Sequence, residues 1–422
     1  MSSQPDKKNV LMIAYHFPPA RGSGVQRTLS FCQNLPDFGW QPQILSVNPR
    51  AYPSQGDDQL KEIPPQVNVE RAFTLDAAKD LAIKGKYLGI TAVPDRFSSW
   101  WLWAVPKAME MIKKTRPDVI WATYPIATSL LIAHSIHKKT GIPWIADFRD
   151  PMFYNSQAED SLTKKVYAKI EKQTIESCQK IITTTQGHSQ LYQQKYSHLN
   201  KNHWQVIPNG YDEGIFKKVE KNRAILEQNP VKQQITILHS GTLYKGHENR
   251  TPQPLFAAIA KLKQTQKITA TNLKIIFRAT GCDKIIQNMI TKADIADIVE
   301  IKPAIPYEKA IEELINVDGL LLLQGKNYNH QVPAKLYEYI RAKKPFLALT
   351  DPQGDTANIM HNAGINTISP LHDEEKIVNA FMGLISSIIT KTPNIAKQDT
   401  INKFSRFNGT KELAMVLDEI VV

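Results

Sequence analysis

The sequence predicts an α/β protein built from two doubly wound domains, each with a parallel sheet between layers of helices. The chain has 422 residues, and one hydrophobic core stops growing at about 250–300 residues, so two domains are expected. Short apolar segments bounded by turn residues alternate with helical segments, which is typical of parallel βαβ units. The alternation starts again near residue 235, which indicates a second sheet.

Six apolar segments define the first sheet, in a domain expected to span residues 1–210. The region 50–100 has scattered prolines and no clear period, so no element is predicted there. The six expected strands are residues 10–15 (VLMIAY), 43–47 (QILSV), 118–123 (DVIWAT), 144–148 (WIADF), 180–185 (KIITTT) and 204–208 (WQVIP).

The polar, lysine-rich stretch 211–234 is expected to connect the two domains, and the second domain to span 235–399. Residues 400–422 have a helical pattern of apolar side chains, and we expect this final helix to pack back on the N-terminal domain. Ligands bind open parallel sheets outside the carboxyl ends of their strands, so a cleft between the domains is expected. The strands of the second sheet are residues 235–241, 273–280, 298–301, 318–324 and 345–349.

Composition places the chain among ordinary globular proteins. Hydrophobic residues make up 42% and charged residues 22%, and no apolar run approaches the roughly 20 residues of a membrane-spanning helix. The N-terminal MSSQPDKKNV lacks a signal-peptide pattern, so a cytoplasmic location is expected. Cys32, Cys178 and Cys282 lie far apart in the sequence, and we expect them to be buried and reduced.

The net charge of +12 suits an acidic partner: nucleic acid, an anionic lipid surface or a phosphorylated small molecule. The basic residues are spread along the whole chain, without an arginine-rich arm, a zinc-finger pattern or an RNA-binding signature. This distribution argues against nucleic acid as a partner.

A glycine-containing turn follows the first predicted strand. Gly22 and Gly24 let the backbone approach a ligand closely, and the start of the next helix presents N–H groups to an anion. The alternative is a plain strand-to-helix turn. The third glycine of the dinucleotide-binding fingerprint falls on Arg27, which argues against a nicotinamide-dependent dehydrogenase.

Arg149 and Asp150 follow the predicted strand 144–148, so a cation and a carboxylate lie at a strand's carboxyl end. With Asp147 they form either part of a functional site or a structural ion-pair cluster. In the second domain, Lys245 and Arg250 follow the turn at Gly241 and can reach an anion above it, unless both are simply solvated.

The most informative segment is Pro333–Tyr339. Pro333 suits the first position of a helix, where the amides of Ala334, Lys335 and Leu336 have no intrahelical partner and form a small anion cradle. Lys335 can then meet a phosphate, while Glu338, one turn deeper, accepts hydrogen bonds from a ribose. Alternatively, Lys335 and Glu338 pair with each other.

An ordered set of motifs along almost the whole chain resembles glycosyltransferase family 4, whose members have the GT-B fold of two Rossmann-like domains facing across a cleft. Each motif is weak alone, and the order makes the set specific. The motifs are His16-Phe-Pro-Pro with Gly22, Gly24 and Arg27, then Trp144–Asp150, Ile207-Pro-Asn-Gly, Ser240-Gly-Thr and Pro333–Tyr339.

The resemblance implies a retaining transfer of a sugar from a nucleotide-diphosphate sugar, usually uridine-linked, without a required metal or other cofactor. Negative charge develops on the departing diphosphate, so fixed cations and N–H groups supply the main catalytic effect and no protein nucleophile is needed. The candidate residues are Arg149, Asp150, Arg250 and Lys335 for catalysis; Gly22, Gly24, Gly241, Thr242, Lys245, His330, Val332, Ala334, Leu336 and Glu338 for the donor; and His16, Arg27 and Trp100 for the acceptor side.

The chain departs from the family pattern at three places. Glu338 matches the second glutamate of the E-x7-E signature, whereas the first falls on His330, so the sugar of the donor is unassigned. The usual Gly-Arg-Leu reads Gly241-Thr-Leu, which leaves Arg250 or Lys245 to supply the charge. Arg149 stands where many relatives carry a histidine.

The segment 95–103 (DRFSSWWLW) places three tryptophans in the domain that builds the acceptor side in this family. Amphipathic aromatic rings suit a membrane interface, and a polyprenyl-diphosphate-linked glycan at the inner leaflet would suit the basic charge, so peripheral association with the cytoplasmic face of the inner membrane is one expectation. The tryptophans can equally be core residues. The expected role is synthesis of a surface polysaccharide or glycan. The alternatives are a nucleotide-sugar epimerase, a phosphorylase or a non-catalytic binding protein. The one feature that favours the non-catalytic protein is His330 at a signature position.

Overall fold

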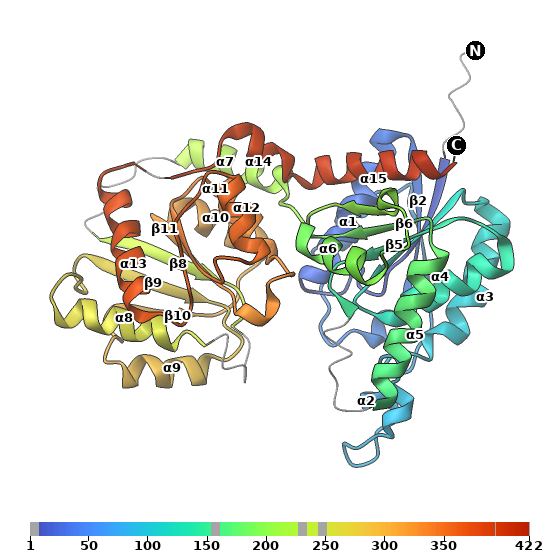
Figure 1. The fold of residues 1–422 in the computed structure, drawn as a ribbon, viewed down its shortest axis with the longest axis horizontal. Helices are drawn as coiled ribbons and strands as arrows, with labels where there is room; N and C mark the ends of the chain where they lie inside the picture. The colour runs from blue at the N-terminus through green and yellow to red at the C-terminus, as the bar shows by residue number, and fades with distance from the viewer. Residues whose placement is uncertain (1–7, 153–160, 227–233, 244–250, 393, 422) are drawn as a thin grey trace. The chain divides into compact units, whose positions relative to one another are not determined.

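The computed structural model describes residues 8–152, 161–226, 234–243, 251–392 and 394–421. The chain divides into two compact units (Figure 1). The first unit comprises Met1–Asn209 and Arg406–Val422, and the second comprises Gly210–Ser405.

The first unit is built on a parallel sheet in the strand order β3-β2-β1-β4-β5-β6-β7. β4 and β5 are buried along their whole length, as expected of central strands covered on both faces. The direction in which successive strands are added reverses between β1 and β4, which makes that position the topological switch point of the sheet. The strands are β1 (Lys8–Ile13), β2 (Trp40–Val47), β3 (Asn68–Ala72), β4 (Val119–Tyr124), β5 (Trp144–Phe148), β6 (Lys180–Thr183) and β7 (Trp204–Val206).

Helices cover both faces of this sheet. α15 packs against α1 on one side, while α3, α4 and α5 lie side by side on the other (Figure 1). The carboxylate of Asp418 on α15 accepts hydrogen bonds from Lys8 at 2.9 Å and from Trp40 at 3.1 Å. The helices are α1 (Ser23–Asn34), α2 (Ala77–Asp80), α3 (Trp100–Thr115), α4 (Ala127–Thr140), α5 (Ser161–Ser177), α6 (Gln186–Lys195) and α15 (Arg406–Val421).

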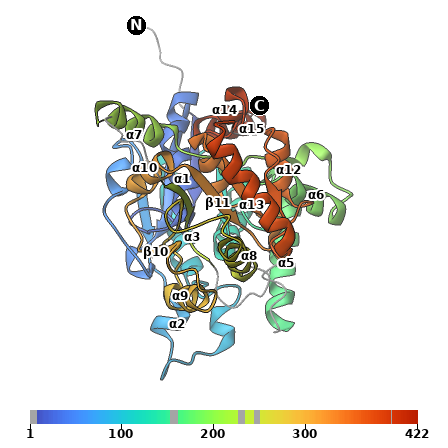
Figure 2. The ribbon, with the colours of Figure 1, turned by 90° about the vertical axis from the view of Figure 1, so that its left-hand side faces the viewer.

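The second unit repeats the architecture with the parallel order β10-β9-β8-β11-β12-β13, so its switch point lies between β8 and β11. Apolar side chains from helices and sheet form one core layer with α8, α9 and α13 and another with α7, α10, α11, α12 and α14 (Figures 1 and 2). The strands are β8 (Ile235–Ser240), β9 (Leu273–Arg278), β10 (Val299–Lys302), β11 (Gly319–Leu323), β12 (Phe346–Leu349) and β13 (Ile368–Ser369). The helices are α7 (Glu213–Leu226), α8 (Gln253–Gln264), α9 (Asp283–Lys292), α10 (Tyr307–Asn316), α11 (Ala334–Ala342), α12 (Asp355–Asn362), α13 (Glu374–Ile389) and α14 (Gln398–Lys403).

The stretch 211–234, expected to be a connection, begins instead with helix α7 of the second unit. Phe216 and Val219 are buried in the second unit's core. The guanidinium of Arg341 binds Glu213 at 2.6 Å and Glu220 at 2.8 Å, and it lies over the Phe216 ring. Apolar spacing and these ion pairs turn a lysine-rich segment into a packed helix.

The end of the chain also differs from the expected single helix over 400–422. Gln398–Lys403 forms α14, assigned to the second unit, and α15 begins only at Arg406 in the first unit. The three cysteines are free and buried, as expected. Within the described ranges, no helix is both long enough and apolar enough to cross a bilayer.

Candidate functional site

The switch point of the second sheet brings two predicted site segments together. Gly241 follows the last residue of β8, and α11 follows β11 after the loop 324–333. β8 and β11 are neighbours in the parallel sheet, so the turn after one and the helix start after the other lie at the same edge. Ligands of open parallel sheets bind at this edge.

The backbone conformation of Gly241 favours glycine, and the Lys335 side chain ends directly beside it. The φ of Gly241, +118°, lies in the region that side chains rarely adopt, and a Cβ there would come within 2.8 Å of the Lys335 ammonium nitrogen. Its amide donates to the Arg278 carbonyl at 2.9 Å, which extends the β8–β9 pairing by one residue. Thr242 is exposed next to it.

Lys335 contacts a histidine that the sequence analysis did not select. Its Nζ lies 3.5 Å from Nε2 of His239, whose Nδ1 lies 3.0 Å from the Leu321 carbonyl. Because that carbonyl can only accept, Nδ1 carries the proton and Nε2 of the neutral ring offers a lone pair to the ammonium. Burial, with Lys335 adding to the effect, lowers the pKa of His239 well below its ordinary value.

The charge of Lys335 is therefore not cancelled by its partner. Burial lowers the pKa of Lys335 to about 8, while the nearby Glu338 acts in the opposite direction. At neutral pH the side chain is an ammonium held next to a neutral ring and directed at the Gly241 turn. An anion at this position would gain from the charge and favour the protonated form.

Glu338 is held by a second residue outside the sequence-predicted set. The Tyr307 hydroxyl, at the start of α10, donates to Glu338 Oε1 at 2.7 Å. No ion pair joins Lys335 to Glu338 in the described part of the chain, so the alternative in which they simply pair is wrong. In the sequence, His239 lies just before the glycine turn and Tyr307 begins a helix after Pro306. These two positions are the features of the sequence that could have identified them.

The start of α11 corrects the predicted anion cradle. Pro333 has an extended ψ of 133° and caps the helix rather than occupying its first turn. The Leu336 amide then donates to the Pro333 carbonyl at 3.0 Å, so this N–H group is not available to a ligand. The side chains of Leu336 and Val332 are buried in the core, and Ala334 is half-buried at the helix start.

His330 lies on the loop before this helix, with Nδ1 at 3.8 Å from Asp355 Oδ2. Its neighbour Asn329 donates to Asp351 at 2.7 Å and accepts from the Asp355 amide at 3.0 Å. These contacts connect the His330 loop to the loop that follows β12.

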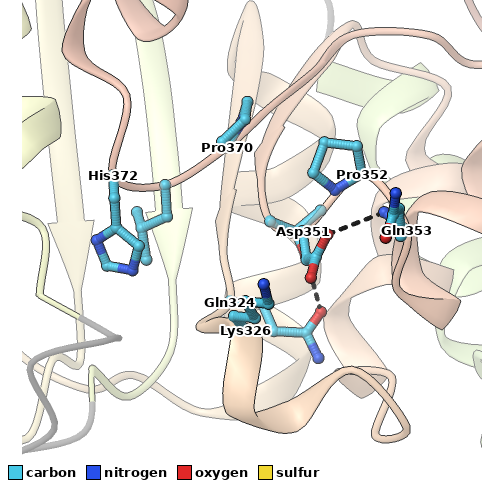
Figure 3. A pocket seen from close by; sticks show the side chains of 9 residues that line it. Gln324, Lys326, Asp351, Pro352, Gln353, Pro370 and His372 are labelled. Atoms are coloured by element: carbon cyan, nitrogen blue, oxygen red, sulfur yellow. Dashed lines mark hydrogen bonds between the residues drawn. The ribbon is translucent and has the colours of Figure 1, made fainter.

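A pocket of about 350 Å³ opens beside those two loops. Figure 3 shows Lys326, Asp351 and His372 around it, each from a loop at the carboxyl end of a different strand. Buried Gln324 is held by Thr350 at 3.2 Å and by the Tyr328 carbonyl at 2.9 Å. No motif marked this pocket, whose lining is Gln324, Lys326, Thr350, Asp351, Pro352, Gln353, Pro370, Leu371 and His372.

Two of the expected donor cations, Lys245 and Arg250, lie outside the described residues. The buried Arg278, the last residue of β9, is paired with a carboxylate. It donates to both carboxylate oxygens of Glu313, one at 2.6 Å, and to the Pro303 carbonyl at 2.8 Å. Arg278 thus fixes α10 to β9.

In the first unit, Arg27 and Asp147 form a buried bidentate ion pair. Arg27 Nε and Nη2 donate to Asp147 at 3.0 and 2.8 Å, and Nη1 donates to the Pro208 carbonyl at 3.0 Å. Thr123 also donates to Asp147 at 3.0 Å. Arg27, predicted on the acceptor side, thus links α1 to β5 and to the Pro208 carbonyl.

Arg149 is also occupied by the protein. Its Nε donates to the Tyr124 carbonyl at 2.9 Å and its Nη1 to the Gly24 carbonyl at 2.6 Å. Burial lowers the pKa of Arg149, against the opposing effect of Asp150 and Asp147. For Asp150, burial raises the pKa and the charge of Arg149 lowers it, with a net upward shift.

The glycine turn after β1 is shaped by His16. α1 begins at Ser23 with Gly22 as its cap at φ +113°, so Gly24 lies in the first turn. A Cβ on Gly24 would lie 3.2 Å from His16 Cγ. Burial, with the charge of Arg149, lowers the pKa of His16 to about 4, so this ring is neutral at physiological pH.

Trp100, predicted on the acceptor side, is a core residue with no exposed surface. Its ring packs edge-on against Tyr15, with 6.0 Å between centroids. Trp101 and Trp103 are 39% and 40% exposed. Helical spacing in the first turn of α3 directs the first tryptophan inward and the other two outward. Across the described residues, no cluster of histidine, cysteine and acidic side chains forms a metal-binding group.

Three kinds of comparison bear on these sites. The family model described as Glycosyltransferase Family 4 matches residues 24–214. No curated protein sequence matches the chain.

Solved structures similar to the chain share its fold at low sequence identity. Sucrose-phosphate synthase from Thermosynechococcus elongatus is 12% identical with a TM-score of 0.69, and 98% of each chain is covered. A structure titled trehalose-6-phosphate from E. coli bound with UDP-2-fluoro glucose is 12% identical, with a TM-score of 0.63 and 97% and 99% coverage. UDP-GlcNAc 2-epimerase from Neisseria meningitidis bound to UDP-GlcNAc is 12% identical, with a TM-score of 0.56 and 97% and 100% coverage.

The fold class and the family resemblance predicted from the motifs are both confirmed. Residues 24–214, most of the first unit, thus match glycosyltransferase family 4, and the chain as a whole has the GT-B fold.

Proposed function

We propose that the protein is a retaining glycosyltransferase that takes a sugar from a nucleotide-diphosphate sugar, with uridine as the favoured base. The observation that carries this proposal is the position of the Lys335 ammonium. It lies beside the neutral imidazole of His239 and faces the turn at Gly241, where the backbone conformation disfavours a side chain. A diphosphate supplies the charge that this arrangement lacks.

The remaining assignments follow from the same edge of the sheet. Glu338, held by Tyr307, would accept hydrogen bonds from the ribose hydroxyls. Gly241 and Thr242 would face the diphosphate, and Lys245 and Arg250 remain proposed as further cations. As the nucleoside diphosphate departs, Lys335 would stabilise the developing negative charge without reorganisation, which is usually the largest catalytic effect. The resemblance to family 4 supports a reaction that needs no bound metal.

In the first unit, Arg149 and Asp150 are proposed to contact the donor sugar or the acceptor. The guanidinium of Arg149 holds its position through Tyr124 and Gly24, and Asp150 has a raised pKa, so this carboxyl is suited to exchanging a proton with a hydroxyl. We propose a glycan or lipid-linked glycan as the acceptor, within surface polysaccharide or glycan synthesis.

A second activity is favoured by specific comparisons. UDP-GlcNAc 2-epimerases share the fold over almost the full chain, including one bound to UDP-GlcNAc. An epimerase uses a nucleotide-sugar pocket but needs no acceptor. The shared fold makes this alternative worth testing.

The experiment has two stages. A panel of nucleotide sugars is first screened by thermal shift, since a ligand that binds the folded chain raises its melting temperature. Each stabilising donor is then incubated with the protein, with and without added lipid-linked glycan, and the products are separated. A sugar-extended acceptor with retained anomeric configuration supports the proposal, whereas a changed nucleotide sugar formed without acceptor would establish the epimerase instead.

A further inference from the structure

The first unit exposes large apolar side chains in one short part of the chain. Among the described residues, fifteen large hydrophobic side chains are exposed, and eight of them lie between residues 81 and 103. Single exposed apolar residues need no explanation, whereas several that share one exposed loop can form an apolar patch of the kind that marks an interaction site. The eight are Leu81, Ile83, Tyr87, Leu88, Ile90, Trp101, Leu102 and Trp103.

Five of these residues lie on a loop, residues 81–94, that projects beyond α2 at the lower end of the first unit in both views (Figures 1 and 2). Ile83, Leu88 and Ile90 are 80%, 74% and 69% exposed. We call residues 81–94 the apolar loop. Its apolar side chains contribute little to any core, so their exposure is unfavourable unless something covers them.

The backbone of the apolar loop is nevertheless fixed. Ile83 and Lys86 exchange two backbone hydrogen bonds, at 2.8 and 3.1 Å, around Lys84 and Gly85. Both central residues have positive φ, as in a two-residue hairpin turn. A short 3-10 helix at Gly89–Ala92 follows. The loop therefore presents its apolar side chains in a preformed arrangement.

The charge of the loop identifies what covers it. Lys84 and Lys86 are exposed, and the sequence 81–94 contains no acidic residue. The acids that flank it are occupied: Asp80 accepts from Arg50 at 2.8 Å, and Asp95 accepts from the Thr128 amide at 2.8 Å. The loop thus combines a net positive charge with apolar side chains and one tyrosine.

We infer that the apolar loop inserts into the surface of an anionic lipid bilayer. Apolar side chains enter the boundary between headgroups and acyl chains, lysines meet anionic headgroups, and the amphipathic ring of Tyr87 suits the interface. The net charge of +12 acts in the same direction. This inference rests on the lipid-linked acceptor proposed above, because it brings the first unit to the surface where such an acceptor lies.

The test is co-sedimentation of the full chain with vesicles, either of phosphatidylcholine alone or of phosphatidylcholine mixed with phosphatidylglycerol. We expect binding to the anionic vesicles that weakens on raising the salt, since charge attraction is screened. The variant Ile83→Ser/Leu88→Ser/Ile90→Ser should bind them at least about tenfold more weakly. Lys84→Gln/Lys86→Gln should lose the preference for anionic lipid.

A matched control changes exposed apolar residues elsewhere: Ile285→Ser/Ile389→Ser, in the second unit, should bind vesicles like the unaltered chain. The inference is overturned if the unaltered chain binds neither vesicle, if the triple variant binds as well as it does, or if the chain forms dimers without lipid that the triple variant abolishes. Thermal shift by the nucleotide-sugar donor is measured on every variant, so loss of vesicle binding with donor binding intact separates this inference from the proposed function.

Discussion

The two units surround their buried cations differently: those of the first unit are bound by a carboxylate or by backbone carbonyls, whereas Lys335 of the second unit lies beside a neutral histidine. In the first unit, Arg27 and Arg149 are saturated by Asp147 and by backbone carbonyls. In the second, the hydrogen-bond partner of Lys335 is the neutral His239, and the nearby Glu338 acts on its charge without forming an ion pair. The same strand order therefore produces one site whose cations hold the domain together and one site whose cation is left for a ligand.

This difference suggests how one fold separates stability from function. A buried cation paired with a carboxylate, as Arg27 is with Asp147, has its charge balanced inside the protein, and removing the carboxylate leaves that charge uncompensated. A cation beside a neutral partner costs more to bury and has a lowered pKa, and an arriving anion relieves both effects. We therefore expect substitutions in the Arg27–Asp147 pair to change folding, and substitutions of Lys335 to change binding and turnover.

The largest expected effect is on the folding of the first unit. Asp147→Ala leaves Arg27 buried without its carboxylate, and breaking such a pair costs about 3–5 kcal/mol. All seven tryptophans lie in the first unit, so the urea dependence of tryptophan fluorescence measures this unit's unfolding. As the control, Asp58→Ala removes the exposed ion pair with Arg21, at 3.8 Å, and should leave the transition unchanged. If Asp147→Ala and Asp58→Ala had the same urea transition, the Arg27–Asp147 pair would not stabilise the first unit.

The next effect is on turnover. Lys335→Ala should lower kcat by about 10²–10³-fold, the range for losing one electrostatic donor to the transition state. The fluorescence transition of the first unit should not move. Lys309→Ala, on the exposed surface of the same unit, is the control in steady-state assays with the donor found by screening. Near-normal turnover of Lys335→Ala would remove Lys335 from the site.

The pH dependence should follow the ammonium of Lys335. Because its pKa is lowered to about 8, kcat/KM should fall above about pH 8, roughly tenfold for each further pH unit. Lys335→Arg keeps its charge and should remove this alkaline fall. The unfolded chain holds the Lys335 proton up to its ordinary pKa of 10.5, so the free energy of unfolding should rise between about pH 8 and 10.5 while activity falls. An alkaline limb that survives in Lys335→Arg would assign the titration to another group.

The smallest expected effect tests the hold on Glu338. Tyr307→Phe removes one hydrogen bond to this carboxylate and should weaken uridine diphosphate binding by about 2–10-fold, equivalent to about 0.5–1.5 kcal/mol. Glu338→Ala should weaken it more. Since both act through the same carboxylate, the double variant should bind like Glu338→Ala alone in calorimetry. Additive losses would show that Tyr307 contacts the nucleotide independently.

The pattern of apolar residues predicted the buried strands of both sheets, but it missed elements that are only partly buried. Each predicted strand forms, because the central strands are continuous apolar runs. β3 was missed because Asn68–Ala72 is an edge strand with one buried residue, and β13 because it has two residues. α7 was taken for a connection because its lysines conceal a narrow apolar stripe around Phe216.

The sequence motifs identified candidate site residues, but they did not identify the residues that contact them. The motifs predicted that Gly241, Lys335 and Glu338 share a site, and the structure places Lys335 beside Gly241. Their partners His239 and Tyr307 lie on β8 and α10 and have no spacing pattern that would have selected them. Arg27 and Trp100 were selected by residue type, and only the fold shows that Asp147 and the core enclose them.

The central claim is that the second switch point holds a cation for the diphosphate of the donor. Calorimetry of the full chain with uridine diphosphate and with uridine, for the unaltered chain and for Lys335→Met, measures this contribution directly. We predict that the unaltered chain binds uridine diphosphate far more tightly than uridine, and that Lys335→Met loses most of this difference while its affinity for uridine is kept. Equal affinity of Lys335→Met and the unaltered chain for uridine diphosphate would contradict the account.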